Sequence, residues 1–139
     1  MAISKLPPQR NRTANPKQFD IDEFEAVESQ IGSARDELLV LVKKSPHDAL
    51  SKFKLSVVNG LLLRANALLG DNRPLADFEQ FDTEVLPSAS DSAMVLGQYL
   101  AALENLRVKH ISQKQGWWYW ADGGGTTGRR TYSPRKLEK

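Results

Sequence analysis

The sequence has no cysteine among its 139 residues. This absence excludes disulfides, thiolate zinc sites, iron–sulfur clusters and cysteine nucleophiles. It also argues against a small secreted domain, because such domains often depend on disulfides. The run of about 18 apolar residues that a membrane span requires is missing too, and residues 1–18 lack the apolar stretch of a signal peptide. We therefore expect a cytoplasmic protein that does not associate with membranes.

Motifs that would identify a reaction are also missing. The glycine-rich stretch DGGGTTG at residues 122–128 is not followed by the Gly-Lys-Ser/Thr of a phosphate-binding loop. The acidic residues of the stretch 77–84 have no glycine near them for a calcium loop. The two histidines, His47 and His110, cannot complete a zinc site without carboxylates. We expect no cofactor, no metal and no enzymatic activity.

The charges are strongly segregated along the chain, although the formal net charge is only +2. Residues 1–18 carry four basic residues and no acid, and residues 107–139 carry eight basic residues against two acids. Residues 19–106 carry fifteen acids against seven basic residues. An acidic body therefore bears two basic ends, which suit phosphate, an acidic partner or the body of the protein itself.

Three long helices are predicted. The first begins after Asp20, which has the spacing of a capping box, and ends near residue 43. Phe19 and Phe24 occupy the positions of a hydrophobic staple, and the apolar residues from Phe24 to Leu41 form a heptad stripe. The second begins at Ser45 and Pro46, and its two adjoining apolar stripes indicate contact with more than one neighbour. The third extends from Ser88 to about residue 110. The spacing predicts an antiparallel bundle that is mainly α-helical.

Two questions remain about the bundle: where the long connection lies, and whether three helices suffice for a core. The long connection at residues 71–87 is predicted to be an ordered loop that tucks its aromatic residues against the helices. Three helices form only a thin core, and a fourth would bury the second helix better. A homodimer that supplies the missing helices is therefore an alternative that the sequence leaves open.

The C-terminal part of the chain changes period. The WWYWA stretch at 117–121 and the RRTYS stretch at 129–133 flank the glycines, which predicts a β-hairpin. Strand alternation places Trp118 and Trp120 on one face and the aromatic residues at 117 and 119 on the other. Because an isolated ribbon is marginal in water, it must lie on the bundle or on a partner. The predicted organisation is a basic N-terminal arm at 1–18, a helical bundle at 19–110, and an aromatic and basic hairpin with its tail at 111–139.

These features predict a non-catalytic interaction module, a small subunit or regulator of a larger protein assembly. The predicted contact surface is the C-terminal ribbon, through Trp117, Trp118, Tyr119, Trp120, Arg129, Arg130 and Tyr132. An alternative is a nucleic-acid-binding accessory protein, in which the basic ends follow phosphate and the tryptophans stack on bases. A further alternative is that the aromatic residues form a small core against the helices.

One pair of residues has a resemblance to a known family. Arg107 and His110 on the third predicted helix are similar to the Arg…His pair of helical RNases of the HEPN type. Such a resemblance implies a helical RNase-like enzyme that uses these two residues. The gap between them is shorter than in that motif, so the resemblance stops short of the spacing that defines the family.

Overall fold

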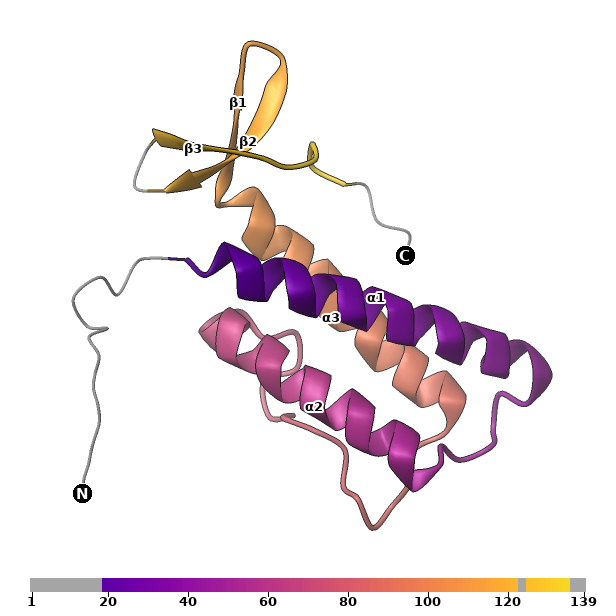
Figure 1. The fold of residues 1–139 in the computed structure, drawn as a ribbon. Helices are drawn as coiled ribbons and strands as arrows, with labels where there is room; N and C mark the ends of the chain where they lie inside the picture. Colours follow the sequence, from indigo (N-terminus) through magenta and orange to yellow (C-terminus); the bar gives the residue numbers. More distant parts are fainter. Residues whose placement is uncertain (1–18, 123–124, 136–139) are drawn as a thin grey trace, which may run out of the picture.

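Three helices form the body of the protein, as the sequence predicts (Figure 1). The computed structural model describes residues 19–122 and 125–135, so the predicted arm at 1–18 lies outside the described residues. In these ranges, the helices are α1 (Ile21–Lys44), α2 (Lys52–Leu69) and α3 (Ala89–Val108). None of the described helices is long and apolar enough to cross a membrane.

The start of α1 confirms the predicted cap. The side chain of Asp20 accepts a hydrogen bond of 3.0 Å from the backbone N–H of Glu23, which would otherwise have no partner in the first turn. The rings of Phe19 and Phe24 lie 5.4 Å apart, as a hydrophobic staple requires. The helix then buries the heptad stripe at Phe24, Val27, Ile31 and Leu38.

Helix α2 begins later than predicted. Ser51, and not Ser45, caps it, and Ser45 instead ends α1 by donating its N–H to the carbonyl oxygen of Leu41. The segment between the helices is held by backbone hydrogen bonds to residues 87–90, including one from Ala89 to Asp48. Both serines satisfy the rule for a helix cap, and these long-range bonds decide between them.

The long connection between α2 and α3 is ordered, which confirms the prediction. It starts with a short 3-10 helix, η4 (Gly70–Asn72). Asn59 of α2 donates to the carbonyl oxygen of Phe81 and accepts from its N–H, at 3.0 and 2.9 Å. Phe78 and Phe81 pack edge to face against each other and partly against the core. The loop therefore covers one part of α2 that the other helices leave open.

The C-terminal element is a three-stranded antiparallel sheet where a two-stranded hairpin was predicted. Its strands are β1 (Ile111–Lys114), β2 (Trp117–Asp122) and β3 (Gly125–Arg130), in that order. The missed strand is β1, which a two-residue turn joins to β2. Gln115 and Gly116 in this turn both have positive φ, 53° and 85°, as a hairpin turn matching the strand twist demands. The predicted glycine-rich tip belongs largely to β3, and residues 123–124 lie outside the described residues.

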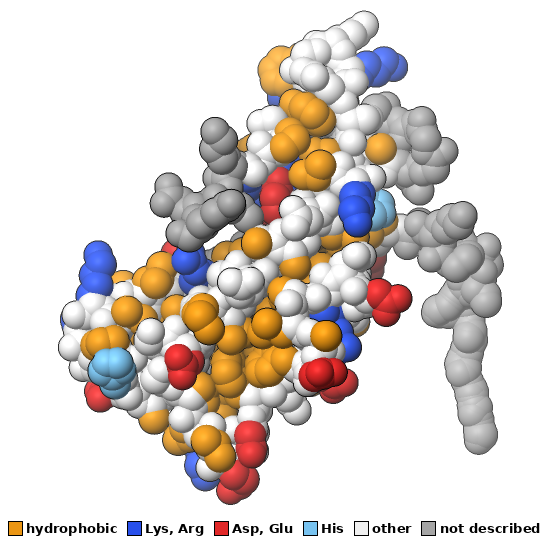
Figure 2. All heavy atoms as spheres, turned by 180° about the vertical axis from the view of Figure 1, so that it is seen from behind, with side chains coloured by type: hydrophobic (Ala, Val, Ile, Leu, Met, Phe, Trp, Pro, Cys, Tyr) orange, Lys and Arg blue, Asp and Glu red, His pale blue; other side chains and the backbone are white. Residues whose placement is uncertain are grey.

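The sheet and the helices share one hydrophobic core. The sheet lies at the C-terminal end of α3 and beside the start of α1 (Figure 1), and Trp120 of β2 belongs to the same buried cluster as Phe24 and Tyr99. On the face opposite to the one seen in Figure 1, hydrophobic side chains gather over the middle of the helical body, with charged side chains mostly around them (Figure 2). The sheet is thus a part of the folded body and completes its core.

Candidate binding surface

The register of the sheet divides its side chains into two faces. Directly paired residues share a face, and residues two apart on one strand share it as well. Ile111 pairs with Trp120, and Lys114 pairs with Trp117. One face, which we call the inner face, therefore carries Ile111, Gln113, Trp118 and Trp120. The other, the outer face, carries Ser112, Lys114, Trp117, Tyr119 and Arg130.

Trp120 anchors the inner face to α1. It is only 1% exposed, and its ring lies 5.4 Å from that of Phe24 and 5.7 Å from that of Phe19. Its indole Nε1–H donates to the carboxylate of Glu25 at 3.1 Å. Burial of a large ring with its one polar group satisfied is the arrangement expected of a core tryptophan. The predicted contact residue Trp120 is therefore covered by the protein itself.

The two consecutive arginines of β3 point to different surroundings. Between the pairs Tyr119–Arg130 and Ala121–Thr126, β3 has more residues than β2, so the strand bulges. Gly128 lies in this bulge with φ +88°, a conformation that side chains rarely adopt. Arg129 forms ion pairs with Asp22, at 2.7 Å, and with Glu25. Arg129 thus ties the strand to the first two turns of α1.

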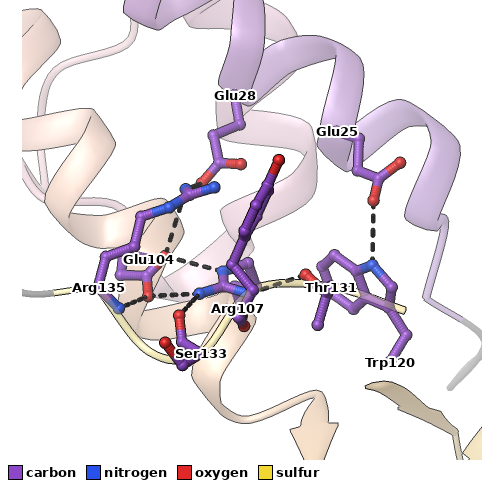
Figure 3. A network of polar contacts seen from close by, with 9 residues as sticks. Glu25, Glu28, Glu104, Arg107, Trp120, Thr131, Ser133 and Arg135 are labelled. Carbon is purple, nitrogen blue, oxygen red and sulfur yellow. Dashed lines mark hydrogen bonds and ion pairs between the residues drawn. The ribbon is translucent and has the colours of Figure 1, made fainter. Parts of the chain in front are cut away.

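The side chain of Arg107 holds the segment that follows β3, residues 131–135, against α3. We call this set of contacts the clasp. Arg107 is 1% exposed and points toward the segment after β3 (Figure 3). Its Nε and Nη2 donate to both carboxylate oxygens of Glu104 at 2.8 Å. Its other three bonds go to the Thr131 hydroxyl and to the carbonyl oxygens of Tyr132 and Ser133, at 2.8–2.9 Å. A guanidinium has five N–H donors, and all five of Arg107 are used inside the protein.

Glu104 and Glu28 hold the end of this clasp through Arg135. The backbone N–H of Arg135 donates to Glu104 at 2.7 Å, and its guanidinium donates to Glu28 at 2.6 Å (Figure 3). Burial alone would raise the pKa of Glu104, but the hydrogen bonds from Arg107 and Arg135 outweigh it, and the pKa is lowered. For Glu28, burial outweighs the charge of Arg135, and the pKa is raised.

The clasp and Arg129 account for much of the charge segregation. Of the six lysines and arginines in the described part of residues 107–135, three form ion pairs with the acidic body: Arg107, Arg129 and Arg135. Their partners are Asp22, Glu25, Glu28 and Glu104. A good part of the basic C-terminal charge is therefore matched by the protein's own acids.

The outer face keeps an exposed aromatic and basic pair. Trp117 is 53% exposed, and the guanidinium carbon of Arg130 lies 3.8 Å from the centre of its ring. Lys114, which pairs with Trp117, is exposed beside them, and Tyr119 is half-buried. Cation–π contact holds the two side chains together and covers one side of the indole. This pair presents a fixed apolar and positively charged surface to solvent.

The seven predicted contact residues are therefore not one surface. Trp120 and Arg129 face α1, whereas Trp117, Tyr119 and Arg130 share the outer face. Trp118 is half-buried on the inner face, and Tyr132 is exposed in the clasped segment, where Arg135 lies over its ring at 5.3 Å. Sequence reasoning missed Glu104 and Lys114. Glu104 also binds Arg135, 31 residues further along the chain, and Lys114 reaches the outer face through strand β1, which was not predicted.

The described residues also place the Arg107 and His110 pair. His110 stacks on Phe19 with ring centres 4.2 Å apart, and its Nδ1 lies 3.0 Å from the carbonyl oxygen of Leu106. Because every donor of Arg107 is used by the clasp, none is left for a substrate phosphate. Within residues 19–122 and 125–135, no group of three or more histidine, aspartate or glutamate side chains is arranged to hold a metal.

Comparisons with protein-family models, with curated proteins and with solved structures found no match for this chain.

Proposed function

We propose that this protein is a non-catalytic interaction module that docks a partner protein through the outer face of its C-terminal sheet. The single observation that supports this most is the Trp117–Arg130 pair, with Trp117 half-exposed under a guanidinium. Tryptophan, tyrosine and arginine are the residue types that dominate binding energy at protein interfaces. Here they lie on two neighbouring strands of a sheet whose opposite face is fixed to the core, so the surface needs little ordering on binding.

The charge of the outer face indicates the chemistry of the partner. Arg130 and Lys114 are both basic, and the structure gives neither of them an ion pair among the described residues. An acidic patch with an apolar centre would complement this face, the acids meeting Arg130 and Lys114 and the apolar centre meeting Trp117. The partner is therefore an acidic protein surface.

Two observations favour a protein over a nucleic acid. Arg130 already covers one side of the Trp117 ring, the position that a stacking base would take. Moreover, three of the basic side chains that were expected to follow phosphate are paired with the protein's own acids. Within residues 107–122 and 125–135 this pairing leaves three of the six basic side chains for the counterion release that drives nucleic-acid binding.

A peptide-display selection on the immobilised protein tests the proposal. With the wild type, we expect enrichment of acidic peptides that contain apolar residues. The double variant Trp117→Ala/Arg130→Ala should lose this enrichment. Val85→Ser, a change at another exposed apolar residue, far from the sheet in sequence, is the matched control and should keep it.

The same proteins should be titrated with oligo(dT) and oligo(U) at low salt. No binding is expected, or weak binding that the double variant leaves unchanged. The proposal is overturned if the wild type enriches no acidic peptides, or if the double variant enriches them equally. Tight, salt-sensitive binding of single strands that requires Trp117 would favour the nucleic-acid alternative.

A further inference from the structure

An apolar groove lies between α1 and α2, away from the sheet. Its volume is about 680 Å³. The apolar residues that line it come from both helices, namely Ala34, Leu38 and Leu41 of α1 and Phe53, Val57, Val58 and Leu61 of α2. Along α1 the lining extends from Gln30 to Leu41, which at 1.5 Å per residue is about 16 Å, or three helical turns. The groove is therefore long enough to take a helix.

Helix α2 exposes apolar side chains along this groove. Phe53 is 76% exposed and Val57 44% exposed, and Gly60 follows at the next position of the same stripe. A Cβ atom at Gly60 would have no other atom within 4 Å, so the space above this residue is open. On the other side, α2 buries Leu55, Leu62 and Ala65 in the core. The helix thus has a second apolar stripe that residues 19–122 and 125–135 leave uncovered.

The charges along the groove are complementary to each other. Glu37 lies on the α1 wall and Lys54 on the α2 wall, and among the described residues neither side chain forms an ion pair. A two-fold axis parallel to the helices sets α1 of one copy opposite α2 of the other. Each Glu37 then faces the Lys54 side of the other copy, and this contact occurs twice. Such a pattern fits the surface to a copy of itself.

We propose that the α1–α2 groove is a homodimer interface that pairs the two helical hairpins in a four-helix bundle. In it, Phe53 of each copy enters the groove of the other, and α2 gains the neighbour that its second stripe lacks. The contact is isologous, so it closes at two copies and does not propagate. This proposal concerns a surface separate from the outer face of the sheet and does not rest on the proposed function.

Sedimentation equilibrium of the full chain, from low to high micromolar concentration, tests the interface. The wild type should pass from the monomer mass of 15.5 kDa to twice that value. Val57→Lys should weaken the dimer at least about tenfold, because it places a charge in the apolar centre. Leu63→Lys is the matched control: Leu63 is 47% exposed on the same helix but does not line the groove, so its dimer should match that of the wild type.

A charge exchange makes the test specific for a second copy. Glu37→Lys and Lys54→Glu should each weaken the dimer, and the two changes together should restore it, because the pair is rebuilt with its signs reversed. Trp117→Ala should leave the dimer intact. A wild type that stays monomeric, a Val57→Lys variant that dimerises normally, or a double variant no better than the single ones overturns the proposal. Circular dichroism of each variant verifies that it is folded.

Discussion

The inner and outer faces of the C-terminal sheet use the same residue types for opposite purposes. Trp120 and Arg129 bind the sheet to α1, whereas Trp117 and Arg130, near them on the same strands, stay at the surface. Successive side chains of a strand alternate between its faces, which separates Trp117 from Trp120. The two arginines point to different surroundings next to the bulge at Gly128. The aromatic and basic cluster in the sequence is thus two clusters in space.

The largest difference between the faces should appear on removing one tryptophan from each. Trp120→Ala should lower the free energy of unfolding by about 3–5 kcal/mol, because it empties a packed site and leaves Glu25 without its indole donor. Trp117→Ala should lower it by about 1 kcal/mol or less, chiefly through the lost contact with Arg130. Urea unfolding of both variants measures the difference. Equal losses would show that the faces are not distinct.

Removing Arg107 from the clasp should lower the free energy of unfolding nearly as much as removing Trp120. Arg107→Ala should cost about 3 kcal/mol, since it leaves the buried carboxylate of Glu104 with its main partner missing. Hydrogen exchange should also rise over residues 131–135, which lose three hydrogen bonds to Arg107. Arg130→Ala on the outer face is the control and should leave that exchange unchanged. Protection of 131–135 that survives Arg107→Ala would contradict the role of the clasp.

A substitution at Gly128 tests the bulge of β3, which precedes Arg130. Gly128→Ala should destabilise the protein by about 1–3 kcal/mol, because a residue with a Cβ is strained at φ +88°. Gly32→Ala in α1 has open space around its new Cβ and should be neutral or stabilising by up to about 1 kcal/mol. Thermal unfolding compares the two. A Gly128→Ala variant as stable as the wild type would indicate that β3 can form without the bulge.

Acid should lower the stability of the protein by protonating Glu104, the partner of Arg107 and Arg135. Because the pKa of Glu104 is lowered in the folded protein, its stabilising contribution is complete above about pH 4.5 and is lost as the pH falls through the folded pKa. The stability gap between the wild type and Glu104→Gln should therefore narrow below that pH. Glu28, whose pKa is raised by burial, changes in the opposite direction and favours folding as it is protonated. A gap that is independent of pH would contradict the ionised state of Glu104.

Local signals predicted the helices well, whereas long-range contacts decided what the sequence could not show. The Asp20 cap, the Phe19–Phe24 staple and the heptad stripe of α1 are all local patterns, and the structure confirms them. The predicted start of α2 was wrong because Ser45 and Ser51 both fit a helix cap. Strand β1 was missed because its ISQK sequence is only weakly typical of a strand.

The same distinction explains the candidate site. Alternation correctly separated Trp120 from Trp117, because the strand period is a property of the sequence. Which face would be covered depends on Glu25, a residue 95 positions away. The pairing of Arg135 with Glu28 spans 107 residues. Because no local pattern encodes such pairs, seven residues were predicted as one contact surface.

These contacts also set the order in which the fold can be completed during synthesis. The helices leave the ribosome first, but part of the start of α1 is covered by residues of 111–135, which are made much later. Until then Phe24 lacks the tryptophan that closes its site, and joining the two segments requires closing a loop of about a hundred residues. The early chain is therefore an incomplete fold with an exposed apolar end, which makes it most prone to aggregation just before strands β1–β3 emerge.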